Sequence, residues 1–131
     1  MNKIDIRSSY RYPVNRKLIR RVINKVLESY KVIESCWVEI NIVGDRKMTE
    51  LHKTYLNEEG TTDVLSFPLQ ENYLSKGRDD FAEGEMLRLG SIFVSYPQSQ
   101  KQANWHHLTT DEEISQLVEH GMLHLLGIHH E

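Results

Sequence analysis

Residues 109–131 read TTDEEISQLVEHGMLHLLGIHHE, and their apolar spacing is the strongest structural signal in the chain. Apolar or small residues recur every three or four positions, which is the period of a helix that buries one face. We expect this helix to begin near Thr109 or Thr110, where Thr110 would form a capping box with Glu113. Gly127 would end the helix in a left-handed conformation. The buried face would consist of Ile114, Leu117, Val118, Gly121 and Leu125.

The rest of the chain alternates between shorter helical and strand patterns. Helical spacing predicts helices over about 15–30 and 46–56. Alternating apolar residues predict strands near 4–6 and 38–42, and short apolar stretches predict two more near 63–67, before Pro68, and 92–94, after Gly90. The polar residues between Gln70 and Leu87 are numerous enough for a loop that covers a cleft. This order of elements indicates an α+β fold, or an α/β-like sandwich, in which helices cover a small mixed sheet.

Length and composition narrow the class of protein. The 131 residues fit a single domain, which we expect to span 1–131. A formal net charge of -3 provides no general attraction for nucleic acid. The chain contains neither a signal peptide nor an apolar run of membrane-spanning length, so the cytoplasm is the expected location. The single cysteine, Cys36, opens an apolar run, so we expect a buried thiol there.

Three histidines near the C-terminus have the spacing of a metal site. His120 and His124 are four positions apart on the predicted helix, so their side chains project from one face on neighbouring turns. His130 follows the glycine that ends the helix and could return to the same ion. Three imidazoles and one open position are typical of catalytic zinc, with nickel, cobalt or copper as competitors. We predict one zinc ion per chain bound by these three residues, with His129 beside the ligands rather than among them.

The other histidines lack this pattern. His52 falls on the predicted second helix, where we expect a surface or boundary position. His106 and His107 precede the last helix and are expected to be a solvated pair. The sequence therefore assigns no role in the metal site to these three residues.

A bound zinc ion would make the chain a metal-dependent hydrolase. The histidine spacing does not show whether the reaction takes place at a carbonyl or at a phosphoryl centre. The histidine spacing equals that of metzincin proteases, H-E-x-x-H-x-x-G-x-x-H. Those enzymes use the glutamate after the first histidine as general base, and here that position is Gly121. A peptidase would therefore lack its proton-handling residue.

Three segments of the chain resemble the YbeY family of bacterial rRNA maturation endoribonucleases. The family signature H-G-x-L-H-L-x-G-x-D-H appears as HGMLHLLGIHH over 120–130. A second segment, L-N-x-x-Y-R and then P-T-D-V-L-S-F-P, appears as LHKTYL over 51–56 and TTDVLSFP over 61–68. A third, L-G-D-I-x-I-S, appears as LGSIFVS over 89–95. The segments occur in family order and span most of the chain.

The resemblance implies a zinc-dependent endoribonuclease that acts in ribosomal RNA maturation and ribosome quality control. Its implied partners are ribosomal RNA and other ribosomal components, with no membrane and no DNA. The strand near 62–68 would border the substrate cleft, although a buried structural strand is an alternative for this segment. The residues expected at the cleft are Thr62, Asp63, Ser66 and Phe67.

Among the positions that depart from the family segments, Leu56 replaces an arginine, and Ser91 and His129 each replace an aspartate. In the family, that arginine is expected to face a phosphate, so its loss predicts reduced nuclease activity. Another cation could take its place, and the candidates are Lys53, Arg78 and Arg88. A catalytically weakened, metal-stabilised ribosome-binding module is therefore the main alternative, and a metallopeptidase is less favoured.

Overall fold

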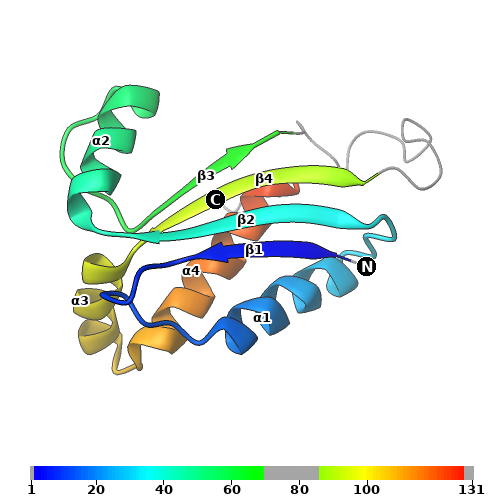
Figure 1. The fold of residues 1–131 in the computed structure, drawn as a ribbon, viewed down its shortest axis with the longest axis horizontal. Helices are drawn as coiled ribbons and strands as arrows, with labels where there is room; N and C mark the ends of the chain where they lie inside the picture. Colours follow the sequence, from blue (N-terminus) through cyan, green and yellow to red (C-terminus); the bar gives the residue numbers. More distant parts are fainter. Residues whose placement is uncertain (1, 70–85, 129–131) are drawn as a thin grey trace.

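The computed structural model describes residues 2–69 and 86–128, in which helices pack against a four-stranded sheet (Figure 1). The elements are β1 Lys3–Arg7, α1 Arg16–Ser29, β2 Cys36–Val43, α2 Asp45–Leu56, β3 Val64–Pro68, β4 Leu87–Ser95, α3 Tyr96–His106 and α4 Thr110–Leu125. The predicted α+β class is confirmed. The predicted loop between 70 and 87 lies almost wholly outside the described residues, and its last residue, Leu87, begins β4.

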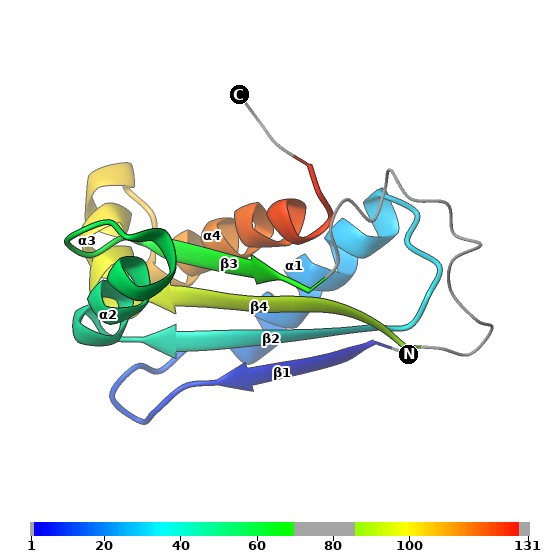
Figure 2. The ribbon, with the colours of Figure 1, turned by 90° about the horizontal axis from the view of Figure 1, so that it is seen from above.

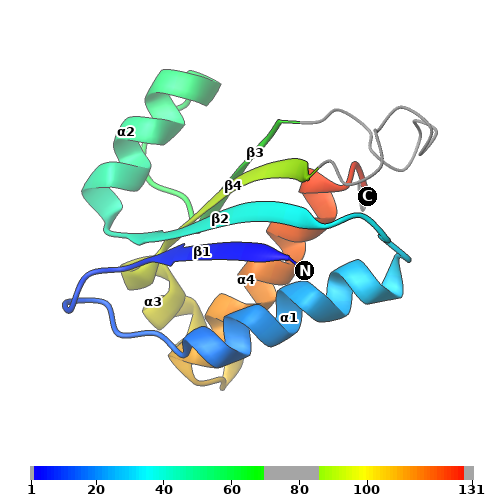
Figure 3. The same ribbon diagram turned by 45° about the vertical axis from the view of Figure 1, so that its right-hand side comes forward.

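The sheet is mixed and has the strand order β1-β2-β4-β3. β1 and β4 run parallel to β2, whereas β3 runs antiparallel to β4 and forms one edge of the sheet. Helices α1 and α4 cover one face, and α2 stands on the opposite side near one end of the strands (Figures 1 and 3). Figure 2 shows that β3 is the strand that lies along α4. The edge strand therefore lies between α4 and α2.

The main core lies between the sheet and the two helices α1 and α4. Its members alternate along the strands and recur at helical spacing along α4, where the predicted stripe from Ile114 to Leu125 is buried as expected. Cys36 belongs to this core and is a free, buried cysteine, as predicted. A second, smaller cluster of Met48, Leu51 and Leu65 packs α2 against the other face. Both faces of the sheet therefore contribute to the packing.

Helix α4 begins where it was predicted, but its capping box lies one residue earlier than expected. Thr109 is the N-cap, and its hydroxyl accepts a hydrogen bond from the backbone N–H of Glu112, whose carboxylate accepts one from the N–H of Thr109. The predicted pair, Thr110 and Glu113, was wrong because both positions already lie inside the helix. Glu113 is instead buried, since it points toward α3. A threonine is followed three residues later by a glutamate both at 109 and 112 and at 110 and 113, so the sequence pattern alone could not choose between the two capping boxes.

The C-terminal end of α4 agrees with the prediction. Gly127 has φ +83°, and its N–H donates to the carbonyl of His124 at 3.0 Å. The N–H of Ile128 donates to the carbonyl of Leu123 at 2.8 Å. This pair of bonds is a Schellman motif, which a left-handed glycine favours.

Helix α3 was not predicted. Only Ser99 and Ala103 of its residues are buried, so α3 lacks the apolar stripe that marks a helix in sequence. Its start does carry a signal, because Ser95 caps the first turn and Pro97 lies within that turn. Within the described part of the chain, no helix is long and apolar enough to span a membrane.

Candidate metal centre and substrate pocket

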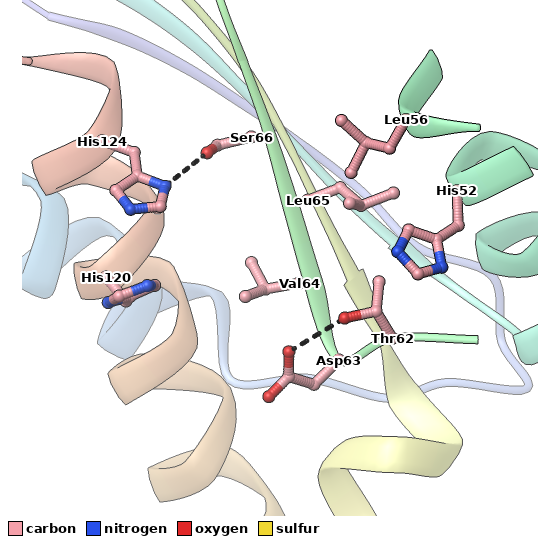
Figure 4. Close-up of a pocket in the computed structure, with 10 residues that line it drawn as sticks. His52, Leu56, Thr62, Asp63, Val64, Leu65, Ser66, His120 and His124 are labelled. Atoms are coloured by element: carbon pink, nitrogen blue, oxygen red, sulfur yellow. Dashed lines mark hydrogen bonds between the residues drawn. The ribbon is translucent and has the colours of Figure 1, made fainter. Parts of the chain in front are cut away.

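A cavity of about 410 Å³ opens at the edge of the sheet, between α4, β3 and α2 (Figure 4). His120 and His124 line the α4 side, whereas His52 and Leu56 line the α2 side. The edge strand runs between these two walls, and residues from both of its faces reach the cavity. The full lining consists of His52, Leu56, Thr62, Asp63, Val64, Leu65, Ser66, His120, Gly121 and His124.

His120 and His124 form a pair of imidazoles on the exposed side of α4. Their ring centroids are 4.6 Å apart, as expected for two residues one helical turn apart. Nδ1 of His124 lies 3.2 Å from Oγ of Ser66 on β3 (Figure 4). If Nδ1 carries the proton, it donates to this hydroxyl, and Nε2 becomes the ring nitrogen that can bind a metal.

The donor chemistry of this pair suits a transition metal, because imidazole nitrogens bind zinc, nickel, cobalt and copper but not magnesium or calcium. Within residues 2–69 and 86–128, no group of three His, Cys, Asp or Glu side chains is placed to hold a metal ion. The predicted third ligand, His130, and its neighbour His129 lie outside the described residues. Two of the three predicted ligands are thus together at the cavity, and the complete ligand set stays a prediction.

The predicted cleft residues separate into two groups. Thr62, Asp63 and Ser66 line the cavity, whereas Phe67 does not. Phe67 points to the other face of β3 because successive side chains of a strand alternate. There it packs edge-on against Tyr55 and Phe93, with ring centroids 5.2 and 5.7 Å apart. Phe67 therefore supports α2 on the sheet rather than bordering the histidine pair.

Gly121 lies where α4 packs directly against the sheet. A Cβ at this position would lie 2.9 Å from both Cδ1 and Cγ2 of Ile92, a fully buried residue on β4. Real Cβ atoms essentially never come so close to another heavy atom. A glutamate, the general base of metzincins, would therefore have no room here without a shift of the helix.

His52 is a pocket residue that the sequence pattern did not identify. Its side chain is 12% exposed, which agrees with the boundary position that was one of the two predicted alternatives. Nδ1 lies 3.1 Å from the carbonyl oxygen of Gly60, and Nε2 lies 2.8 Å from a carboxylate oxygen of Glu58. These contacts come from the loop that follows α2. The loop contacts form only after folding, so helical spacing alone could not have indicated them.

Comparison with known proteins identifies the family. The family described as endoribonuclease YbeY matches residues 3–131. The chain belongs to the YbeY family. Endoribonuclease YbeY of Bacillus cereus is 32% identical over 114 residues, which cover 86% of this chain and 72% of the relative. Endoribonuclease YbeY of Bacillus thuringiensis is 31% identical, with the same coverage.

A solved structure agrees with this assignment. The solution structure of TM1509 from Thermotoga maritima has a TM-score of 0.59 and is 26% identical in sequence. The match covers 100% of this chain and 75% of that protein. Membership of the YbeY endoribonuclease family confirms the resemblance drawn from the three sequence segments. It makes the chain a hydrolase that acts on RNA and does not favour a peptidase.

The departure at Leu56 from the YbeY segments lies in the pocket itself, where this side chain lines the α2 wall. Two of the three proposed replacements for the family arginine can be located. Lys53 is exposed on α2 and does not line the cavity. Arg88 stacks over the ring of Trp37 at 4.9 Å, on the face of the sheet opposite α4. Arg78 lies outside the described residues.

A polar network holds the start of α2 next to the pocket. The carboxylate of Asp45 accepts hydrogen bonds from the hydroxyls of Ser95, at 2.9 Å, and Thr61, at 3.2 Å. It also accepts one from the side-chain amide of Gln98 on α3, at 3.2 Å. Partial burial opposes ionisation of Asp45, but these hydrogen bonds outweigh it and lower the pKa of the carboxyl. The network ties the loop before β3, which carries Thr62 and Asp63, to two helices.

His106 is exposed, as predicted, but it also has a partner that the sequence did not indicate. Its Nδ1 lies 2.7 Å from a carboxylate oxygen of Glu113, whose side chain is 4% exposed. This contact joins the end of α3 to the first turn of α4, so it depends on a helix that the sequence pattern did not indicate. His107 ends α3 in a left-handed conformation and is exposed, as expected.

Proposed function

We propose that the chain is a zinc-dependent endoribonuclease that cleaves ribosomal RNA during its maturation and quality control. The observation that carries this proposal is the pair of imidazoles of His120 and His124, which face a cavity beside an edge strand. Membership of an endoribonuclease family supports RNA as the polymer that enters this cavity. Such an enzyme would work in the cytoplasm, in contact with ribosomal components.

The proposed ligands are His120, His124 and His130, with His129 beside them and one zinc ion per chain. When bound, zinc supplies Lewis-acid chemistry, which activates water as a nucleophile and draws charge from a phosphoryl group. Nickel, cobalt or copper could bind the same nitrogens. The hydroxyl of Ser66 holds the His124 ring in one orientation, so we infer that it positions this ligand.

The walls of the pocket would position RNA rather than react with it. Thr62 and Asp63 present a hydroxyl and a carboxylate, which can hydrogen-bond donors on the sugar or the base. On the opposite wall, Leu56 offers no charge to a phosphate oxygen. Phosphoryl transfer depends on neutralising the charge that develops on those oxygens. We therefore propose that cleavage is slower than in relatives with an arginine at this position.

The decisive experiment compares cleavage of a single-stranded ribosomal RNA fragment by the zinc-loaded chain with and without chelator. We expect cleavage only with zinc, no cleavage by His124→Ala, and normal cleavage by His107→Ala as the matched histidine control. Ser66→Ala should retain the fold but weaken zinc affinity by about 10- to 100-fold, because it removes the hydrogen bond that orients a ligand. Tight zinc binding without RNA cleavage would overturn the enzyme assignment in favour of a binding module.

A further inference from the structure

His52 makes two contacts that together determine its hydrogen-bonding state. A backbone carbonyl and an ionised carboxylate can only accept hydrogen bonds. The carbonyl of Gly60 faces Nδ1, and the carboxylate of Glu58 faces Nε2. Both contacts can be hydrogen bonds at once only in the form that carries a proton on each ring nitrogen. In that form the ring would be a cation in the wall of the pocket.

The two contacts differ in how firmly they are held. The Gly60 carbonyl belongs to the backbone of the loop and orients the ring. The side chain of Glu58 is 65% exposed, so its ion pair with Nε2 lies in high-dielectric surroundings and is weak. Nε2 of His52 is thus held in a fixed direction by the Gly60 contact, and the Glu58 carboxylate that it faces can be exchanged for another anion. A phosphate oxygen could take the place of that carboxylate oxygen without disturbing the Gly60 contact.

The charges around the cavity leave His52 as the cation available for this role. Of the described side chains that line the cavity, only the three histidines can become positively charged. Two of them, His120 and His124, are the proposed zinc ligands. Leu56 lies one helical turn from His52 and also lines the cavity, so positions 52 and 56, which both depart from the family segment, are neighbours in one wall. Glu58 contacts the ring directly, and the other titratable groups that line the same cavity are Asp63, His120 and His124.

We propose that His52 is a phosphate-binding residue for the RNA strand, with Nε2–H donating to a phosphate oxygen where it now contacts Glu58. This inference rests on the proposed RNA-cleaving function of the same pocket. His52 stands on the α2 wall, across the edge strand from the imidazole pair (Figure 4). It therefore positions the strand through a phosphate and is not assigned a part in breaking the bond.

The test measures binding of an uncleavable 2′-O-methyl oligoribonucleotide by fluorescence anisotropy, with zinc present to keep the other two imidazoles unprotonated. His52→Asn keeps an amide N–H that can reach Gly60 and removes only the second donor. We expect this variant to bind roughly three- to tenfold more weakly at pH ~6. The slope of log affinity against log salt should fall by about 0.7, the value for one lost phosphate contact on a single strand.

His107→Asn and Lys25→Ala are the controls for an exposed histidine and an exposed cation, and neither should change the affinity or the salt slope. Leu56→Arg in the His52→Asn chain should restore affinity and salt slope, because arginine stays charged and stands on the same wall of the pocket.

An unchanged affinity and salt slope in His52→Asn would overturn the proposal. A loss in His52→Asn that Leu56→Arg does not restore, together with an unchanged salt slope, would also overturn it, because the histidine would then be purely structural. The assay measures binding of an uncleavable RNA. It would therefore still test the role of His52 if the chain proved unable to cleave RNA.

Discussion

Gly121→Ala tests how tightly α4 must approach the sheet to hold its histidines over the pocket. Alanine in place of glycine in a helix interior contributes about 1 kcal/mol of stability through helix propensity. The new Cβ would lie 2.9 Å from two atoms of Ile92, and overpacking of this kind costs roughly 1–3 kcal/mol. Ile92 is fully buried on a central strand, so it has little room to move. We expect a net loss of about 0–2 kcal/mol.

A double-mutant cycle separates the two effects. Ile92→Ala alone should cost about 2–5 kcal/mol because it leaves a cavity in the core. In that background all three Ile92 atoms that crowd the new Cβ are gone. Gly121→Ala should then stabilise the chain by about 1 kcal/mol, through propensity and partial filling of the cavity. The coupling energy between the two sites should therefore be about 1–3 kcal/mol.

Urea unfolding of the four proteins, followed by far-UV circular dichroism, measures this cycle. Zinc affinity of the single variant provides a second reading, because a displaced α4 would separate His124 from Ser66 and weaken metal binding. Equal effects of Gly121→Ala in the two backgrounds would refute the packing argument. The glycine would then have to be explained by something other than its distance from Ile92.

Three further predictions address charge and chemistry. Leu56→Arg should raise the rate of RNA cleavage by up to about 10²-fold in a stopped assay, and no gain would mean that a cation there is not needed. The pKa of Asp45 is lowered in the folded chain, so its stabilising contribution is present above pH ~4 and is lost as the pH falls through the folded value. Asp45→Asn should accordingly destabilise the chain by about 1–2 kcal/mol at pH 7 and by less near pH 3, as measured by urea unfolding. Burial raises the pKa of Cys36 to about 12, so mass spectrometry should detect iodoacetamide labelling at pH 8 only after unfolding.

Local sequence determined the features that depend on neighbours along the chain. The period of apolar residues in 109–127 located α4, its buried stripe and its glycine end, because these follow from helix geometry alone. The same period placed His120 and His124 on one face. Short apolar and alternating stretches located the strands. The observed β2 and β4 are longer than predicted, because each continues beyond the stretch in which the apolar pattern is clear. The family could also be identified from the sequence, because each of its motifs is a contiguous stretch of the chain.

Tertiary structure decided which distant residues share the pocket. Ser66 and His124 are 58 positions apart, and they meet because β3 pairs antiparallel at the sheet edge beside α4. That pairing also turned Phe67 away from the cavity, since a strand alternates its faces. His52 became a pocket residue through a loop that returns over α2. Such contacts depend on how elements pack, and packing between residues far apart in the chain leaves no periodic signal in the sequence.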